Sequence, residues 1–207
     1  MAVRMRPQIR YSTGPESGPR RLASIERPTL DGESQDVLIG RHLHEVIAAV
    51  CEAGHTGPAL RERVRDACAE LVRREHGGWH ARSIALRIEG YTQVYFAFFA
   101  PPADWRYLGS EIPVTAGIVD LGWESARGEV LYDELKSGGY RAPVIDTRNR
   151  EQVERYRRDG IERYGRRFKG VRLLLLGAPF ASRVLLPSGE LVPITDTPYR
   201  FGAQDSR

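Results

Sequence analysis

The chain has 207 residues, of which 41% are hydrophobic and 28% are charged, so it holds enough apolar material for one packed domain. No apolar stretch approaches the roughly 20 residues that span a bilayer, and no apolar segment follows the basic amino terminus. We therefore expect a cytoplasmic protein, and its net charge of +4 is compatible with a polyanionic partner.

The first part of the chain divides into a polar tail and two helical segments. Residues 1–35 are rich in Arg, Pro, Gly and Ser, and we expect a flexible basic tail before a single domain at residues 36–200. Apolar residues then recur at helical spacing over residues 35–53, before Gly54, and again over residues 58–76. These two segments are predicted to be α-helices.

Extended segments are predicted to follow the second helix. The runs 84–88 and 92–99 are rich in apolar and aromatic residues, and Glu89 and Gly90 between them are typical of a turn. Residues 105–114 are predicted to add a further edge segment. This part of the chain is therefore predicted to be β structure.

The segment 117–138 is predicted to be a β-hairpin that carries charged side chains. Gly128 lies in the turn between two apolar-rich runs. Because side chains alternate along a strand, Glu134 and Lys136 should share one face, and strand pairing can bring Asp120 close to Glu134. Charges inside a sheet are costly unless they are paired or bind a metal, so an ordinary ion pair and a metal site are both open at this point.

The rest of the chain is predicted to supply a basic helix, a buried strand and a hairpin. The helix covers residues 147–167, and Asp146 or Thr147 can cap it. The run 171–176, which is apolar except for Arg172, is predicted to be a buried strand. Residues 184–194 are predicted to form the hairpin, around a Pro-Ser-Gly turn, and the remaining residues a polar tail.

The lysines of the chain stand out against its other basic residues. Only Lys136 and Lys169 are lysines, and the remaining 29 of the 31 basic residues are arginines. An arginine side chain keeps its proton in a protein, whereas burial can tune a lysine. We infer that position 136 needs the chemistry of lysine.

Four short motifs follow one another along the chain. They are GxxxH ending at His44, GxxD ending at Asp120, ExK ending at Lys136 and QxxxY ending at Tyr156. Over residues 36–176 this order resembles the RecB-family nuclease module of the PD-(D/E)XK, or restriction-endonuclease-like, superfamily, although the predicted helix at 58–76 is additional. The resemblance implies an α/β fold with a restriction-endonuclease-like core, in which a central mixed β-sheet is flanked by α-helices.

The resemblance also implies a metal site. Asp120, Glu134 and the Leu135 carbonyl would hold Mg²⁺ or Mn²⁺, since these ions prefer hard oxygen ligands. His44 would add a nitrogen ligand that favours Mn²⁺, and a structural role for this histidine stays open. If His44 is not a ligand, the next candidates are carboxylates on the two predicted helices, Glu45, Glu62 and Glu70.

The remaining motif residues are given a part in hydrolysis by the same resemblance. Lys136 would position the attacking water and help to deprotonate it, and together with the metal it would offset charge on the phosphorus oxygens. Gln152 and Tyr156 would brace the site or contact phosphate, with packing as the alternative for the tyrosine. The implied activity is metal-dependent cleavage of DNA, by an exo- or endonuclease, in repair or in defence against foreign DNA.

DNA is the partner that this interpretation requires. The basic helix follows the hairpin directly, and a solvated helix face is the alternative to a DNA track. Its candidates for contacts with DNA phosphates are Arg148, Arg155, Arg158 and Arg163. For the whole chain, the alternatives are a catalytically inactive nucleic-acid-binding module on the same fold and an RNase or toxin-type nuclease.

Overall fold

The computed structural model of the protein describes residues 35–74, 79–115, 117–137 and 146–201, so the predicted tail before residue 35 lies outside the described part. None of the helices in these ranges is long and apolar enough to cross a membrane. The regular elements are α1 (Gln35–Glu52), α2 (Leu60–Arg74), α3 (Trp79–Phe98), β1 (Trp105–Val114), β2 (Gly117–Ser125), β3 (Val130–Lys136), α4 (Thr147–Tyr164), η1 (Gly165–Arg167), β4 (Phe168–Leu175), η2 (Pro179–Ala181), β5 (Arg183–Leu185), β6 (Leu191–Pro193) and η3 (Ile194–Asp196).

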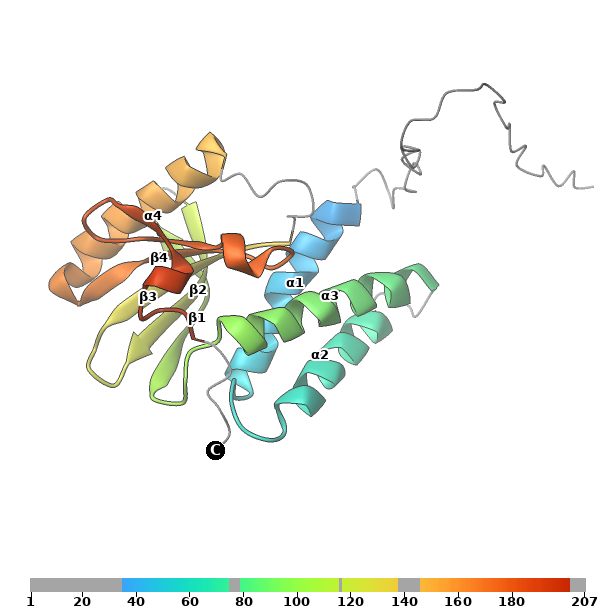
Figure 1. Ribbon diagram of the computed structural model, residues 1–207. Coiled ribbons are helices and arrows are strands. Elements are labelled where there is room, and N and C mark those ends of the chain that lie inside the picture. The colour runs from blue at the N-terminus through green and yellow to red at the C-terminus, as the bar shows by residue number, and fades with distance from the viewer. Residues whose placement is uncertain (1–34, 75–78, 116, 138–145, 202–207) are drawn as a thin grey trace, which may run out of the picture.

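A six-stranded sheet lies between two layers of helices (Figure 1). The strands follow one another from β1 to β6, and β3 and β4 pair in parallel while the other neighbours are antiparallel. α1, α2 and α3 gather on one side of the sheet, and α4, which connects β3 to β4, covers the other. The predicted α/β fold with a mixed sheet flanked by helices is confirmed, and it is compatible with a restriction-endonuclease-like core.

Two apolar clusters hold these layers together. On the three-helix side, Leu43 of α1 and Ile88 of α3 belong to one cluster with Leu131 of β3. On the other side, Val153 of α4 belongs to a cluster with Val171 of β4. All five side chains are fully buried, and burial of each aliphatic side chain contributes about 1.5–3 kcal/mol relative to exposure.

α4 is capped at both ends and packs closely on the sheet. The Asp146 carboxylate accepts the backbone N–H of Asn149 at 2.7 Å, as the sequence predicts for the first turn. Gly165 ends the helix in a left-handed conformation with a φ of 56°. Gly160 permits the close approach, because a Cβ atom there would lie 2.3 Å from the ring of Phe168. The helix is thus held in a defined position against β4.

The segment from residue 79 to residue 98 is a helix, and the prediction of strands at 84–88 and 92–99 is wrong. The buried apolar side chains of this segment recur at helical spacing, as Ile84, Ile88, Tyr91 and Tyr95. Aromatic and β-branched residues favour strands only weakly, and packing against α1 and α2 outweighs that preference here. The sheet therefore begins at β1.

The end of the described chain packs on the domain, so the prediction of a polar tail is wrong as far as residue 201. The ring of Phe201 lies 5.2 Å from the ring of Trp105 and 4.9 Å from the guanidinium carbon of Arg172. The carbonyl of Tyr199 accepts a hydrogen bond from the same guanidinium at 3.1 Å. This segment covers the buried arginine of β4 from outside.

Candidate active site

The pairing of β2 with β3 stops where two carboxylates meet. Leu121 and Asp133 are the last paired residues, and the same register would place Asp120 opposite Glu134. Beyond that pair, the Asp120 carboxylate accepts the backbone N–H of Leu135 at 2.6 Å. A side chain of one strand thus binds the backbone of the other, and both carboxylates lie at the end of the ladder.

Both of these carboxylates are buried. Glu134 is 2% exposed and Asp120 is 9% exposed. Burial raises the pKa of each side chain to about 7, and the negative charge of Asp120 adds to the rise at Glu134. Each of these buried carboxyl groups is stabilised either by binding a proton or by a nearby cation.

The two oxygens of Glu134 differ in their surroundings. Oε1 accepts a hydrogen bond from the Lys136 ammonium at 2.5 Å. Oε2 is buried and has no hydrogen-bond partner among the described residues. An unpaired buried carboxylate oxygen is costly, and such atoms in folded proteins are commonly explained by function or by a bound ion.

A chain of hydrogen bonds connects Lys136 with α4 and with the start of β2. The ammonium donates to the Gln152 carbonyl oxygen at 3.3 Å, and the Gln152 amide donates to the Tyr156 hydroxyl at 2.7 Å. That hydroxyl donates to the backbone carbonyl of Ile118 at 2.6 Å. Gly117 makes this approach possible, because a Cβ atom there would lie 3.0 Å from the tyrosine ring. The predicted QxxxY and GxxD motifs therefore meet.

His44 reaches the same place from the opposite helix layer. Its Nδ1 atom lies 3.3 Å from Oδ1 of Asp120. Burial lowers the pKa of His44, although Glu134 opposes the change. A lowered pKa favours the neutral imidazole, which is the form that binds metals. All four predicted metal-binding positions are thus brought together.

The donors at this place fit a hard divalent cation. Two carboxylates and a backbone carbonyl are the ligands that Mg²⁺ and Mn²⁺ prefer, and an imidazole is acceptable to Mn²⁺. In the described residues, no group of three or more His, Cys, Asp and Glu side chains is arranged so that it could hold a metal ion. The unpaired Oε2 atom of Glu134 is the oxygen that a cation would satisfy.

The other carboxylates considered as ligands lie elsewhere. Glu45 is paired with the Arg74 guanidinium, and Glu70 is paired with Arg73. Glu62 is exposed in the first turn of α2. All three side chains belong to α1 or α2 and are either ion-paired or exposed to solvent. They are therefore not candidates for the site at the end of the β2–β3 ladder.

Two of the predicted arginines lie on the side of α4 that carries Gln152. Arg148 is four residues before Gln152 and Arg155 is three residues after it, so the three share one helix face. Both arginines are exposed, and neither makes an ion pair or hydrogen bond with a described residue. They are therefore available for a polyanion at the site.

The other two predicted arginines are held by the protein. Arg158 donates to the Glu154 carboxylate at 3.2 Å and borders a separate hollow along α4. Arg163 donates to the carbonyl of Pro113 at 3.0 Å and lies 3.6 Å from the Asp159 carboxylate. Arg158 and Arg163 thus have protein partners, whereas Arg148 and Arg155 have none among the described residues.

One carboxylate beside the site has no signal in the sequence. Glu111 of β1 lies between residues that pair with the two neighbours of Asp120. In the sequence it is a single acidic residue in an edge segment, and only the strand register reveals its position.

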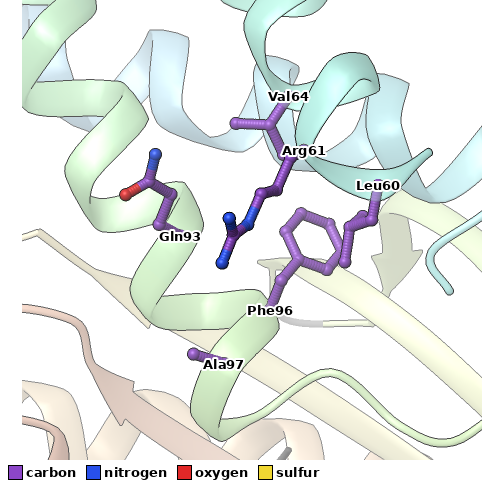
Figure 2. Close-up of a pocket in the computed structure, with 6 residues that line it drawn as sticks. All are labelled: Leu60, Arg61, Val64, Gln93, Phe96 and Ala97. Carbon is purple, nitrogen blue, oxygen red and sulfur yellow. The ribbon is translucent and has the colours of Figure 1, made fainter. Parts of the chain in front are cut away.

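A hollow of about 540 Å³ between α2 and α3 lies apart from these residues (Figure 2). Figure 2 shows the Arg61 side chain extending into it, beside Gln93 and Phe96. Its lining holds no carboxylate and none of the predicted site residues. The carboxylates at the end of the β2–β3 ladder remain the candidate active site.

No family model matches the sequence, and no curated protein matches it. Among solved structures, a repair endonuclease from Pyrococcus abyssi is similar over 34% of this chain and 29% of its own, at 25% sequence identity and a TM-score of 0.28. The similar region thus spans less than a third of that endonuclease, and a TM-score this low does not establish a common fold.

Proposed function

We propose that this protein is a metal-dependent nuclease that hydrolyses phosphodiester bonds in DNA, as the RecB-like, PD-(D/E)XK motifs imply. The observation that carries the proposal is the state of Glu134. The Glu134 carboxylate is buried, and a second buried carboxylate, that of Asp120, lies beside it. One of its oxygens accepts a hydrogen bond from Lys136, and the other has no partner among the described residues. Most buried side-chain oxygens in proteins have a hydrogen-bond partner, so the unpaired oxygen of Glu134 favours a bound cation.

Mg²⁺ or Mn²⁺ would be held by Asp120, Glu134 and the Leu135 carbonyl, with His44 as a nitrogen donor. A bound cation supplies positive charge that stabilises the transition state and lowers the pKa of a coordinated water. The site is shielded from water on the side of the sheet, because Glu134 and Leu135 are each only 2% exposed. The strength of each charge interaction rises in such an environment.

Lys136 would hold and activate the attacking water from the side of α4. Its ammonium is oriented by Glu134 and by the Gln152 amide, which is itself fixed by the Tyr156 hydroxyl. Gln152 and Tyr156 therefore act as positioning residues. Since the Lys136 side chain is 29% exposed, it can also reach a water or a phosphate at the surface.

DNA would approach over the side of α4 that carries Arg148 and Arg155. These exposed guanidinium groups can contact phosphates, and phosphate contacts supply most of the affinity in sequence-independent binding. We also propose a cytoplasmic location. The buried, unpaired thiols of Cys51 and Cys68 are compatible with a reducing compartment.

The test is a substrate panel with a matched variant. The purified protein is incubated with linear duplex DNA, circular duplex DNA, single-stranded DNA and RNA, each in EDTA, Mg²⁺ or Mn²⁺. We expect DNA to be degraded only with a metal, and not by Asp120→Asn. Cleavage of RNA alone would indicate an RNase, and DNA binding without cleavage under any condition would indicate an inactive binding module.

A further inference from the structure

β1 is irregular where it passes the candidate active site. Its pairing with β2 shifts register between Tyr107 and Gly109. Two residues later, Glu111 has a φ of 48°. Among the described residues other than glycine, it is the one with a positive φ. Such a conformation is unfavourable for a residue with a side chain and persists where the surrounding structure holds it, often at functional sites.

The strand register places this residue at the position that corresponds to Asp120. Ser110 pairs with Leu121, and Ile112 pairs with Val119, so Glu111 and Asp120 hold corresponding positions between these two pairs of the β1–β2 ladder. Two carboxylates in this arrangement repel each other unless a cation lies between or beside them.

The side chain of Glu111 has no partner among the described residues. It is exposed, and it makes no ion pair or hydrogen bond with any of them. An unpaired carboxylate therefore lies in the strand next to Asp120, which the proposed function assigns to the metal.

A second observation points to a cation at this place. Glu134 is buried in β3, on the other side of β2 from Glu111, and its Oε2 atom has no partner among the described residues. The Oε2 atom of Glu134 and the carboxylate of Glu111, neither of which has a partner among the described residues, thus belong to the two strands on either side of Asp120. A single positive ion at Asp120 would satisfy both.

We propose that Glu111 is a third carboxylate ligand, direct or through a water, of the divalent cation at Asp120. The inference rests on the proposed function and adds a residue from β1 to the cation site. The positive φ of 48° is found at this same residue. Glu111 would close the solvent side of the site, opposite Glu134.

The test is calorimetric titration of Mn²⁺ into the full-length, metal-free protein, so that the readout does not depend on cleavage. We expect Glu111→Gln to weaken Mn²⁺ binding by about tenfold to a hundredfold, the range found when groups that support a metal site are removed. Glu190→Gln is the matched control, because Glu190 is an exposed carboxylate of the β5–β6 hairpin. It should bind Mn²⁺ as the parent does.

A second variant separates the ligand role from a backbone role. Glu111→Gly relieves the strain of the positive φ, so its melting temperature in EDTA should equal or exceed that of the parent. Its Mn²⁺ affinity should nevertheless fall as far as that of Glu111→Gln. Parental Mn²⁺ affinity in both Glu111 variants would overturn the inference.

The failure of this inference is distinguishable from failure of the proposed function. If the parent binds Mn²⁺ and cleaves DNA while Glu111→Gln binds Mn²⁺ equally well, only the role of Glu111 falls. If the parent binds no Mn²⁺, or if Asp120→Asn binds it unchanged, the cation site itself is wrong and both fall.

Discussion

Asp133 and Glu134 are neighbours in β3 and equally inaccessible to solvent, but only Asp133 has a full set of partners. Its carboxylate binds two nitrogens of Arg172, each at 2.6 Å, and accepts hydrogen bonds from Trp123 and Tyr95, each at 3.0 Å. The Glu134 carboxylate has one oxygen on an ammonium and the other without a partner among the described residues. The first carboxylate stabilises the fold, and the second is available for chemistry.

This contrast predicts opposite effects for two similar substitutions. Asp133→Asn should lower the free energy of unfolding by about 3–5 kcal/mol, because it leaves the buried Arg172 guanidinium without its countercharge. Glu134→Gln should leave stability equal or higher and abolish DNA cleavage. Urea unfolding and a cleavage assay on both variants check this. An active Glu134→Gln, or an Asp133→Asn as stable as the parent, would contradict the assignment.

The raised pKa values predict a specific pH dependence of stability. In the folded, metal-free protein Asp120 and Glu134 have pKa values of about 7, above those of the unfolded chain, so the folded state binds more protons between about pH 4 and 7. The stability from these protons is complete at low pH and is lost as the pH rises through about 7. For one ionisable group, the free energy of unfolding changes by at most about 1.4 kcal/mol per pH unit.

Thermal unfolding in EDTA measures this effect as a difference between variants. The stability of Asp120→Asn relative to the parent should grow from pH 5 to pH 8, since the amide does not ionise. Mn²⁺ should stabilise the parent more at pH 8 than at pH 5. A difference that stays constant over this range would show that Asp120 ionises normally in the folded protein.

Lys136→Arg tests whether position 136 needs lysine. The ammonium lies between the carboxylate of Glu134 and the amide of Gln152, a space that suits a compact group. A guanidinium is planar, larger and always protonated, so it should displace the attacking water. We expect the cleavage rate to fall at least about a hundredfold, with DNA affinity in Ca²⁺ unchanged. Cleavage within a few-fold of the parent would reduce Lys136 to a simple positive charge.

The arginines of α4 can be tested as a matched pair. Arg155→Gln should weaken DNA binding in Ca²⁺ and reduce the slope of log affinity against log salt by about one, because one phosphate contact is lost. Arg158→Gln removes the same charge from a side chain that Glu154 holds elsewhere on the helix, so the slope should stay the same. Equal effects of the two substitutions would point to a diffuse electrostatic contribution.

The hairpin and its charges were predictable from sequence because their signals are local. Strand alternation places Glu134 and Lys136 on one face, and the spacing of Gln152 and Tyr156 places both on one side of α4. The structure agrees on these points. The position of His44 beside Asp120 depends on how α1 packs on the sheet, and only the family resemblance suggested it.

Other features have no local signal or a misleading one. The aromatic residues of α3 resemble those of strands, and their helical spacing becomes decisive only when the neighbouring helices are present to bury them. Glu111 lies between the residues that pair with the two neighbours of Asp120, in a strand that includes a bulge and a residue with positive φ. A sequence pattern does not encode such a register.

The parallel pairing of β3 with β4 also determines when the site can form during folding. The β2–β3 hairpin can pair early because its contacts are local, but Gln152 arrives only when the α4 crossover docks β4 on the sheet. His44 is separated from Asp120 by the whole of α2, α3 and β1. We therefore expect nuclease activity to return in the slowest phase of refolding, later than the fluorescence change of the buried Trp123.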